Sequence, residues 1–415
     1  MTKSAHSDSP EQKEFRQHCR EWLRDNPYPE TDMRLPPTAM EIQAPEHMRY
    51  FQGWQKAAYD AGLVGCDYPI EVGGGGRNNC QHIANAEMFA AKTPFLPNVI
   101  GLGMAAPTLF HHGSKVLGQR LLPKLFSGEE IWCQGFSEPG AGSDLANVQT
   151  FAERDGDKWI INGHKVWTSL AHFAEWMILL LRTDKADKYR GMSYFVVPIR
   201  AALGKGVTVR PLIKITGETG FNEVLFDNLE VNDAYRLDEV GNGWQVAMTT
   251  LLYERGGGER LTPASGGRIQ KSVAVDGLRR GAYGLIDLAR GTARGEQLAS
   301  DDPIIRDRIM QNIIDEQASR QNRRRARAPH LIDHPTRISL QQKLLITEIP
   351  QNIAQLGTEI AGLAGSLGTA DQHAPEAGRW PMEYMASFGS TIAGGTSEIQ
   401  RNILGERVLG LPKTK

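Results

Sequence analysis

The chain has 415 residues, of which 40% are apolar and 23% charged, and its net charge is −1. This length allows two or three domains, and the near-neutral charge excludes a global field that would attract nucleic acid or acidic lipid. The longest apolar runs are far shorter than the ~20 residues of a membrane span, and the N-terminus lacks the apolar core of a signal peptide. Four cysteines without CxxC spacing indicate neither a metal site nor a disulfide framework. We therefore expect a cytoplasmic protein that binds neither nucleic acid nor a membrane.

The first part of the chain is predicted to be helical. Ser9, Pro10 and Gln12 form the pattern of an N-cap, a first-turn proline and a capping-box partner. A second helix is predicted over Pro45–Ala61, and it ends at Gly62 because glycine is the usual residue just past a helix C-terminus.

From residue 132 the period of the pattern changes. Asp155-Gly156 predicts a hairpin, and the β-rich runs form a small antiparallel barrel or sandwich. Helices return from residue 241 onward. The order helix, strand, helix predicts an α+β fold and excludes a Rossmann fold, in which strands and helices alternate. The predicted strands are Phe151–Arg154, Lys158–Ile161, Trp176–Arg182, Tyr194–Pro198, Val207–Arg210 and Val224–Phe226.

The most informative stretch is Cys133–Gln149, with the sequence CQGFSEPGAGSDLANVQ. Its Pro-Gly-Ala-Gly run cannot carry a helix or a central strand, so it predicts an exposed turn. Backbone N–H groups and the short hydroxyls of Ser137 and Ser143 could approach an anionic or heteroaromatic ligand closely there. The residues alone leave a second interpretation open, a Gly-rich surface loop without a ligand.

Three blocks together resemble the acyl-CoA dehydrogenase family: SEPGAGSD at 137–144, NGHKVWTS at 162–169 and GGTSEIQRNILGERVLGLP at 394–412. They occur in the family's order and at its spacing, and the likeness covers nearly the whole chain. The resemblance implies an N-terminal helical domain over 1–131, a central β domain over 132–240 and a C-terminal four-helix bundle over 241–415. It also implies FAD as the cofactor, an acyl-CoA as the substrate and an electron-transferring flavoprotein as a partner.

The resemblance assigns the cofactor to residues in all three blocks. It implies that the Ser137 hydroxyl bonds to the flavin ring, that Trp167 packs against this ring and that Ser169 lies near flavin N5. From its position alone, Trp167 would more often be a core tryptophan on a strand. The cofactor-binding residues that the resemblance implies are Phe136, Ser137, Gly142, Ser143, Trp167, Ser169, Thr396 and Glu398.

Within the family, the catalytic base occupies one of two positions in the chain. Many family members place a glutamate immediately before the Gly-Thr-Ser of the C-terminal block, where this chain has Gly394, which cannot take a proton. Members that resemble isovaleryl-CoA dehydrogenase carry the base on the first helix after the β domain. That helix is Gly243–Arg255 here, and its glutamate is Glu254. We therefore expect Glu254 to be the base and give Glu398 no catalytic role.

The residues alone favour a different role for Glu254. A glutamate near a helix C-terminus is disfavoured by the helix dipole and is usually a surface ion-pair partner. Burial beside a flavin would instead raise the pKa of a glutamate above its usual value of about 4.3 and fit it to abstract an activated α-proton.

The substrate contacts also follow from the resemblance. The Gly394 amide would hold the thioester oxygen, Ser143 would meet the CoA moiety, and Arg255 would support the site or supply substrate-side electrostatics. The substrate-binding residues implied are thus Ser143, Arg255, Gly394 and Gly395. A base on the helix goes, within the family, with branched or bulky acyl groups.

The chain departs from the family's pattern in two elements that normally act across a subunit interface. The Arg-x-x-Phe-Gly element is missing, since no phenylalanine lies between Phe226 and Phe388, and Gly362–Gly368 lacks the glutamine of Gln-x-x-Gly-Gly-x-Gly. A homotetramer with altered FAD contacts and an α2β2 hetero-oligomer both remain open. The basic run Arg320–Arg327 is either a solvated helix end or a contact to CoA phosphates or a partner.

Two further functions compete with a dehydrogenase. One is a family offshoot that uses oxygen, either an acyl-CoA oxidase or a flavin monooxygenase-like enzyme. The other is a non-catalytic or co-catalytic subunit that keeps the fold; the glycine at 394 favours it, and Glu254 opposes it.

Overall fold

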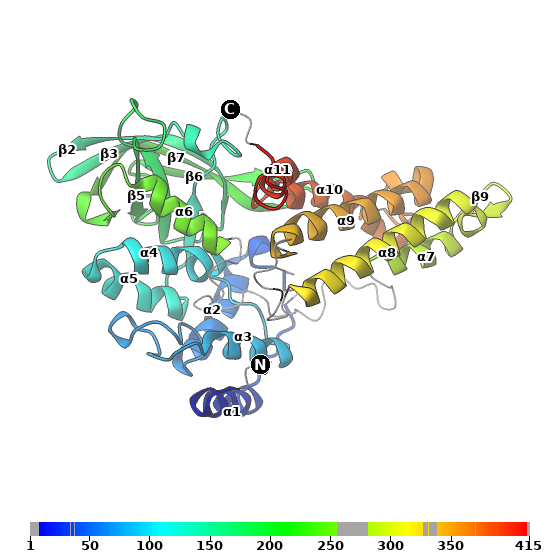
Figure 1. Cartoon of the computed structure of the whole chain (residues 1–415), viewed down its shortest axis with the longest axis horizontal. Coiled ribbons are helices and arrows are strands. Elements are labelled where there is room, and N and C mark those ends of the chain that lie inside the picture. Colours follow the sequence, from blue (N-terminus) through cyan, green and yellow to red (C-terminus); the bar gives the residue numbers. More distant parts are fainter. Residues whose placement is uncertain are drawn as a thin grey trace. The chain divides into compact units, whose positions relative to one another are not determined.

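The computed structural model of the chain describes residues 8–33, 35–36, 38–254, 281–326, 331, 338–369 and 371–412 (Figure 1). The chain divides into two compact units, Met1–Ser272 and Val273–Lys415. The first unit contains helices α1 to α6 and an eight-stranded sheet, and the second contains helices α7 to α11 and a short hairpin. Within the described residues, no helix has both the length and the apolar character needed to cross a membrane.

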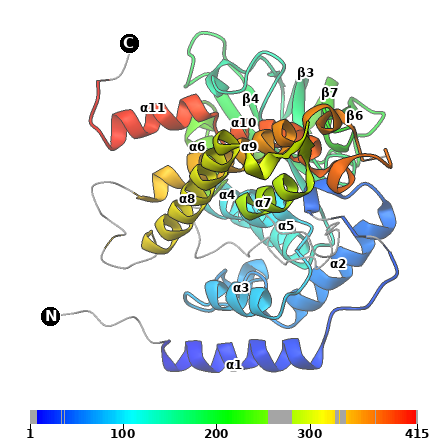
Figure 2. The ribbon, with the colours of Figure 1, turned by 90° about the vertical axis from the view of Figure 1, so that its right-hand side faces the viewer.

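The N-terminal helices begin as the sequence predicts. Ser9 caps α1 (Pro10–Asp25): its Oγ accepts the Gln12 N–H at 3.2 Å, and the Gln12 side chain accepts the Ser9 N–H at 2.9 Å. Helix α1 packs against α3, and α2 packs against α5 (Figure 2). A π-helical turn over Gly101–Ala105 leads into α4. The remaining helices of this part are α2 (Pro45–Asp60), α3 (Gln81–Ala90), α4 (Ala106–His112) and α5 (Lys115–Ser127).

The central sheet has the strand order β6-β7-β3-β2-β4-β5-β8, and β1 also pairs with β4. Most pairs are antiparallel, including the predicted hairpin in which Asp155 lies opposite Lys158, but β1 and β2 both pair with β4 in parallel. Within residues 132–237, all of which are described, the path of pairing does not close into a barrel. The strands are β1 (Trp132–Gly135), β2 (Phe151–Asp155), β3 (Lys158–Ser169), β4 (Trp176–Arg182), β5 (Met192–Val197), β6 (Val207–Ile213), β7 (Thr219–Asn232) and β8 (Arg236–Leu237).

Both faces of the sheet are buried at β4 and β5. Alternate residues of a strand point to opposite faces. Ile178 and Tyr194 belong to the cluster that contains the N-terminal helices, whereas Leu179 and Phe195 belong to a second cluster on the other side. This arrangement explains why both strands are mostly apolar along their length, and it places Tyr194 on the side of the helices.

Helix α6 (Gly243–Glu254) lies directly on β5. A Cβ on Gly243 would be 2.5 Å from the backbone of Ser193, so only glycine allows the helix to start at this distance from the strand. The Gly241 N–H also donates to Ser193 Oγ at 3.2 Å. The start of α6 is therefore fixed by the backbone of the strand that carries Tyr194.

The second unit is organised around α9, which contacts α7, α8, α10 and α11 (Figure 1). Its core includes Leu285, Ile309, Leu356 and Trp380. The described part of the basic run, Arg320–Arg325, forms the C-terminal end of α8. The elements are α7 (Ala282–Gly291), β9 (Ala293–Arg294), β10 (Gln297–Leu298), α8 (Pro303–Arg325), α9 (Ile338–Ala361), α10 (Arg379–Ile392) and α11 (Ser397–Arg407).

The loop between β1 and β2 is held at both of its ends by one buried ion pair. Lys165 of β3 is 0% exposed, and its Nζ donates to the Phe136 carbonyl oxygen at 3.0 Å and to Glu138 Oε1 at 2.8 Å. The Glu138 carboxylate also accepts the N–H groups of Gln149 at 2.6 Å and Thr150 at 2.9 Å. Burial lowers the pKa of Lys165 to about 8, against the opposing effect of Glu138, so the lysine is charged at neutral pH.

Lys165→Met should lower the free energy of unfolding by about 3–5 kcal/mol, because it leaves the Glu138 charge buried without its partner. Lys158→Met is the matched control: Lys158 lies on the same strand and pairs with Glu230 at 2.8 Å, but both side chains are exposed. Solvent screens an exposed pair, so the control should lose far less stability. Urea unfolding followed by circular dichroism compares the two variants, and equal losses would contradict the role given to Lys165.

Candidate active site

The Gly-rich turn of the first block is open on its outer side. Glu138 and Ala141 exchange two backbone hydrogen bonds, at 2.8 and 3.1 Å, around Pro139 and Gly140. A Cβ added to Gly140 or Gly142 would meet no atom of the described residues within 4 Å, and neither residue has a positive φ. Neither crowding nor backbone conformation within the chain therefore explains the glycines at 140 and 142. Close approach of a ligand to this backbone would explain them.

The first and second blocks are brought together in the structure. The Val166 N–H donates to the Ser137 carbonyl oxygen at 2.9 Å, so the first predicted flavin contact lies beside the strand segment that precedes Trp167. Ser143 is exposed next to Asp144, which pairs with Lys188 at 2.9 Å. Both predicted hydroxyls, on Ser137 and Ser143, thus belong to one loop whose two ends meet at the ion pair of Lys165.

Trp167 is presented to the outside by a strained backbone. Its φ is 59°, and the pairing of β3 with β7 is irregular between Lys165 and Thr168. The left-handed region costs a bulky residue free energy, and such strain concentrates at functional sites. The indole is 58% exposed and contacts Phe221 edge-on at 5.8 Å, whereas Ser169, two residues later, is 9% exposed. Trp167 is therefore not the core tryptophan that its position on a strand alone would predict.

These residues fit a flat, polar-edged ring such as the flavin of FAD. An exposed indole offers a face for stacking, the half-buried Ser137 offers a hydroxyl beside it, and the open backbone at Gly142 allows close approach. Thr168 Oγ1 is buried without a hydrogen-bond partner in the described part of the chain. Its side chain does not share the exposure of Trp167, as expected for a neighbouring residue on a strand.

Glu254 is half-buried at the end of α6, in the same unit as the loop. One helical turn earlier, Thr250 Oγ1 lies 2.9 Å from the hydroxyl of Tyr194. The ring of Tyr194 in turn contacts the ring of Phe136 edge-on, with 5.8 Å between the centroids. A continuous set of side-chain contacts therefore joins the helix of the predicted base to the predicted flavin loop.

Sequence reasoning missed Lys165, Tyr194 and Thr250. A lysine inside the block NGHKVWTS could have been suspected of pairing with the glutamate of SEPGAGSD, since both blocks were expected at one site. No sequence signal marks Tyr194 or Thr250, because each becomes notable only when β5 and α6 are placed side by side.

The third block lies in the second unit. Thr396 is the N-cap of α11, and its Oγ1 accepts the Ile399 N–H at 3.3 Å. Gly394 and Gly395 precede it with φ values of 66° and 99°. The pKa of Glu398 lies below its usual value because the carboxylate bonds to its own N–H and to the Thr396 hydroxyl. A helix N-terminus with two preceding glycines can hold a phosphate group.

The roles predicted for Arg255 and for the end of the basic run stay predictions. Arg255 lies outside the described residues, as does Arg327 of the basic run. Within the described residues, no cluster of three or more His, Cys, Asp or Glu side chains could hold a metal ion.

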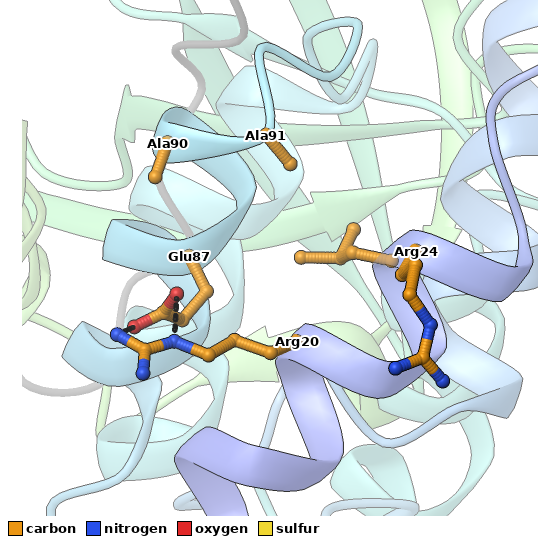
Figure 3. Close-up of a pocket in the computed structure, with 6 residues that line it drawn as sticks. Arg20, Arg24, Glu87, Ala90 and Ala91 are labelled. Carbon is orange, nitrogen blue, oxygen red and sulfur yellow. Dashed lines mark hydrogen bonds and ion pairs between the residues drawn. The ribbon is translucent and has the colours of Figure 1, made fainter.

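A shallow pocket of about 220 Å³ lies elsewhere, between α1 and α3 (Figure 3). Arg20 and Arg16 both bond to the Glu87 carboxylate at its edge, at 2.9 and 2.7 Å. Glu87 and Arg20 thus join α1 to α3, whereas Arg24 pairs with its neighbour Asp25 on α1 at 2.7 Å. None of the predicted site residues lines it; it is lined by Arg20, Leu23, Arg24, Glu87, Ala90 and Ala91.

Family models match almost the whole chain: the N-terminal domain of acyl-CoA dehydrogenase over residues 9–129, the middle domain over 133–229 and the C-terminal domain over 241–409. The acyl-CoA dehydrogenase IpdE1 of Mycobacterium tuberculosis is 37% identical over 407 residues, which cover 96% of this chain and 98% of that protein. The mitochondrial isovaleryl-CoA dehydrogenase of Pongo abelii is 29% identical over 261 residues, covering 60% and 57%.

Solved structures agree with this assignment. The Tcur3481-Tcur3483 steroid ACAD matches with a TM-score of 0.69 and 26% identity, over 98% of this chain and 99% of that chain. The ChsE4-ChsE5 complex of Mycobacterium tuberculosis shares the fold, with a TM-score of 0.67 and 24% identity over the whole of both chains. The expected fold, with an N-terminal helical domain, a central β domain and a C-terminal helical domain, is confirmed. The chain is therefore an enzyme of the acyl-CoA dehydrogenase family.

Proposed function

We propose that the chain removes one hydrogen each from Cα and Cβ of an acyl-CoA thioester and forms a trans-2-enoyl-CoA. Glu254 takes the α-proton as general base. FAD, when bound, accepts the β-hydrogen with its electron pair, a step that no side chain can perform. The observation that carries this proposal is the set of contacts in which Tyr194 joins Phe136 of the first block to Thr250, one turn before Glu254.

In this proposal, different residues of the first unit bind the flavin and the CoA moiety. Ser137 and the backbone at Phe136 hold the edge of the flavin, Trp167 packs against its face, and Ser169 stands near its reacting nitrogen. The Lys165–Glu138 pair keeps the Phe136 carbonyl and both loop ends in place, so that these contacts form without reordering the loop. The open backbone at Gly142 allows close approach of the cofactor, and Ser143 meets both the cofactor and the CoA moiety.

We assign further contacts to residues of the third block, which lies in the second unit, and to Arg255 of the first unit. The Gly394 amide holds the thioester oxygen as it gains enolate character, with Gly395 beside it. Thr396, at the N-terminus of α11, meets the FAD pyrophosphate, and Glu398 provides a polar contact to the dinucleotide. Arg255, just beyond the described part of α6, supports the substrate side. The three domains proposed for these roles are residues 1–131, 132–240 and 241–415.

The substrate we propose is a branched or ring-bearing acyl-CoA, and the electron acceptor an electron-transferring flavoprotein. A base on the helix after the β domain supports the choice of substrate, and so does the likeness to a protein described as a steroid ACAD. The missing Arg-x-x-Phe-Gly element supports an assembly with a second, different chain, most simply α2β2, over a homotetramer. The likeness to a structure described as the ChsE4-ChsE5 complex agrees with this choice.

Glu254→Gln should slow the bleaching of the flavin by an acyl-CoA by about 10²–10⁴-fold, because the amide cannot accept the α-proton. Glu153→Gln, at an exposed position of β2 with no assigned role, is the control and should bleach at nearly the wild-type rate. Anaerobic stopped-flow absorbance with a panel of acyl-CoAs measures both. Undiminished bleaching in Glu254→Gln would remove Glu254 as the base.

Gly142→Ala should leave the free energy of unfolding within about 0.5 kcal/mol of wild type, since its Cβ would meet no atom in the described part of the chain. It should weaken binding of FAD or of the acyl-CoA by about tenfold, or ~1.4 kcal/mol. Gly53→Ala on α2, where an added Cβ likewise meets no atom of the residues that the structure describes, is the control and should leave binding unchanged. Fluorescence titration of apoprotein and holoprotein measures the two affinities, and wild-type values for both would contradict a ligand contact at Gly142.

A further inference from the structure

Three buried hydroxyls from three different elements meet on the inner face of α6. Thr250 Oγ1 of α6 lies 2.9 Å from Thr108 Oγ1 of α4 and 2.9 Å from the Tyr194 hydroxyl of β5. All three residues are 0% exposed. A buried hydroxyl costs free energy unless it is hydrogen-bonded, so the hydroxyls of Thr108 and Tyr194 both depend on Thr250, which itself also donates to the Val246 carbonyl oxygen at 3.2 Å. The cluster therefore fixes α6 to α4 and to β5 at one point.

This point lies directly before the predicted base. Residues four apart share one face of a helix, and helical side chains lean towards the preceding turn. The Glu254 side chain consequently extends from the same face as Thr250 and towards it. Burial raises the pKa of Tyr194 above its usual value and the negative charge of Glu254 raises it further, although the Thr250 bond lowers it. The carboxylate is thus within electrostatic reach of a phenol that keeps its proton at any working pH.

Tyr194 also contacts the cofactor side of the site. Its ring meets Phe136 edge-on at 5.8 Å, and the Phe136 carbonyl oxygen is held by Lys165. One side chain thereby spans from the loop of the first block to the helix of the base. A displacement of α6 relative to the loop would have to break the Tyr194–Thr250 bond or the Tyr194–Phe136 contact.

We propose that Tyr194 and Thr250 are positioning residues for Glu254. Their hydroxyls hold the last turn of α6 in register with the flavin loop, and their dipoles favour the charged carboxylate over the protonated acid. This inference rests on the proposed function, in which Glu254 is the base. Without the two hydroxyls the carboxylate would be both less well placed and harder to ionise.

Other polar and titratable groups lie near this end of α6. Their contribution to the pH dependence must be distinguished from that of Tyr194 and Thr250. His111 Nε2 lies 3.1 Å from the hydroxyl of Tyr253, and burial together with His112 lowers the pKa of His111. His112 bonds to Thr249 Oγ1 at 2.8 Å and to Asp238 at 3.1 Å. Tyr68 is buried on the same side, with its pKa raised by burial and by Tyr253.

The test is the pH dependence of anaerobic flavin bleaching for wild type, Tyr194→Phe and Thr250→Val. Each variant should raise the apparent pKa of the bleaching rate by about half a unit or more and lower the rate at neutral pH by about 3- to 10-fold. Both changes keep the shape of the side chain, and thermal unfolding with the visible flavin spectrum checks that each variant is folded and loaded. A His111→Gln background shows whether the nearest imidazole supplies any of the shift.

Thr249→Val is the matched control. It also removes a hydroxyl bond between α6 and α4, to His112, but Thr249 lies about 140° around the helix from Glu254. In Thr249→Val the apparent pKa of the bleaching rate should stay at the wild-type value. A shift in this control equal to that in Tyr194→Phe and Thr250→Val would overturn the inference. A wild-type pKa in Tyr194→Phe and Thr250→Val, with bleaching lost in Glu254→Gln, would overturn the positioning role alone. Full bleaching in Glu254→Gln would overturn the base assignment, and the positioning role with it.

Discussion

The arrangement of the first unit depends on two buried cations that hold one loop. Lys165 holds the start of the loop through Phe136 and Glu138, and Arg182, which is 7% exposed, donates to the carbonyl oxygens of Ala146 at 2.8 Å and Val148 at 3.2 Å. A loop rich in glycine has high conformational entropy and would not keep one shape alone. The two cations supply the hydrogen bonds that the loop cannot make with itself.

Because the two cations hold the loop from inside, its middle remains open to a ligand. The charges lie inside, on β3 and β4, while Gly142 and Ser143 lie exposed outside. The strained backbone at Trp167 lies on the same strand, and the irregular pairing after Lys165 turns the indole outward. The stability of the loop and the exposure of the ring thus come from neighbouring residues of one strand.

The sequence predicted those features that local rules determine. The capping box at Ser9, the hairpin at Asp155-Gly156 and the strand Trp176–Arg182 are all present, because each depends on residues close together in the chain. Strand β1 was missed, since its four residues pair in parallel with β4, more than forty residues later. Strand β3 was predicted too short, because its second half is polar and continues through the irregularity that precedes Thr168.

The sequence predicted the main residues of the site but not the residues that hold them in place. The three blocks pointed to Ser137, Trp167 and Glu254 through a resemblance, whereas the contacts among Phe136, Tyr194 and Thr250 depend on the packing of β5 between the loop and α6. Hydroxyls at 108, 194 and 250 have no pattern in the sequence, since only the tertiary fold brings them together. The burial of Lys165 was not predicted either, because lysine side chains are mostly exposed.

The central claim is that this chain, or its assembly with a partner, carries out α,β-dehydrogenation. The most direct measurement is anaerobic mixing of the purified wild-type protein with branched and ring-bearing acyl-CoAs, with mass spectrometry of the thioester that results. The account predicts that the flavin is bleached and that the product is lighter than the substrate by two hydrogen atoms. A protein that binds no flavin, or one whose flavin stays oxidised with every acyl-CoA while the thioester is unchanged, would contradict it.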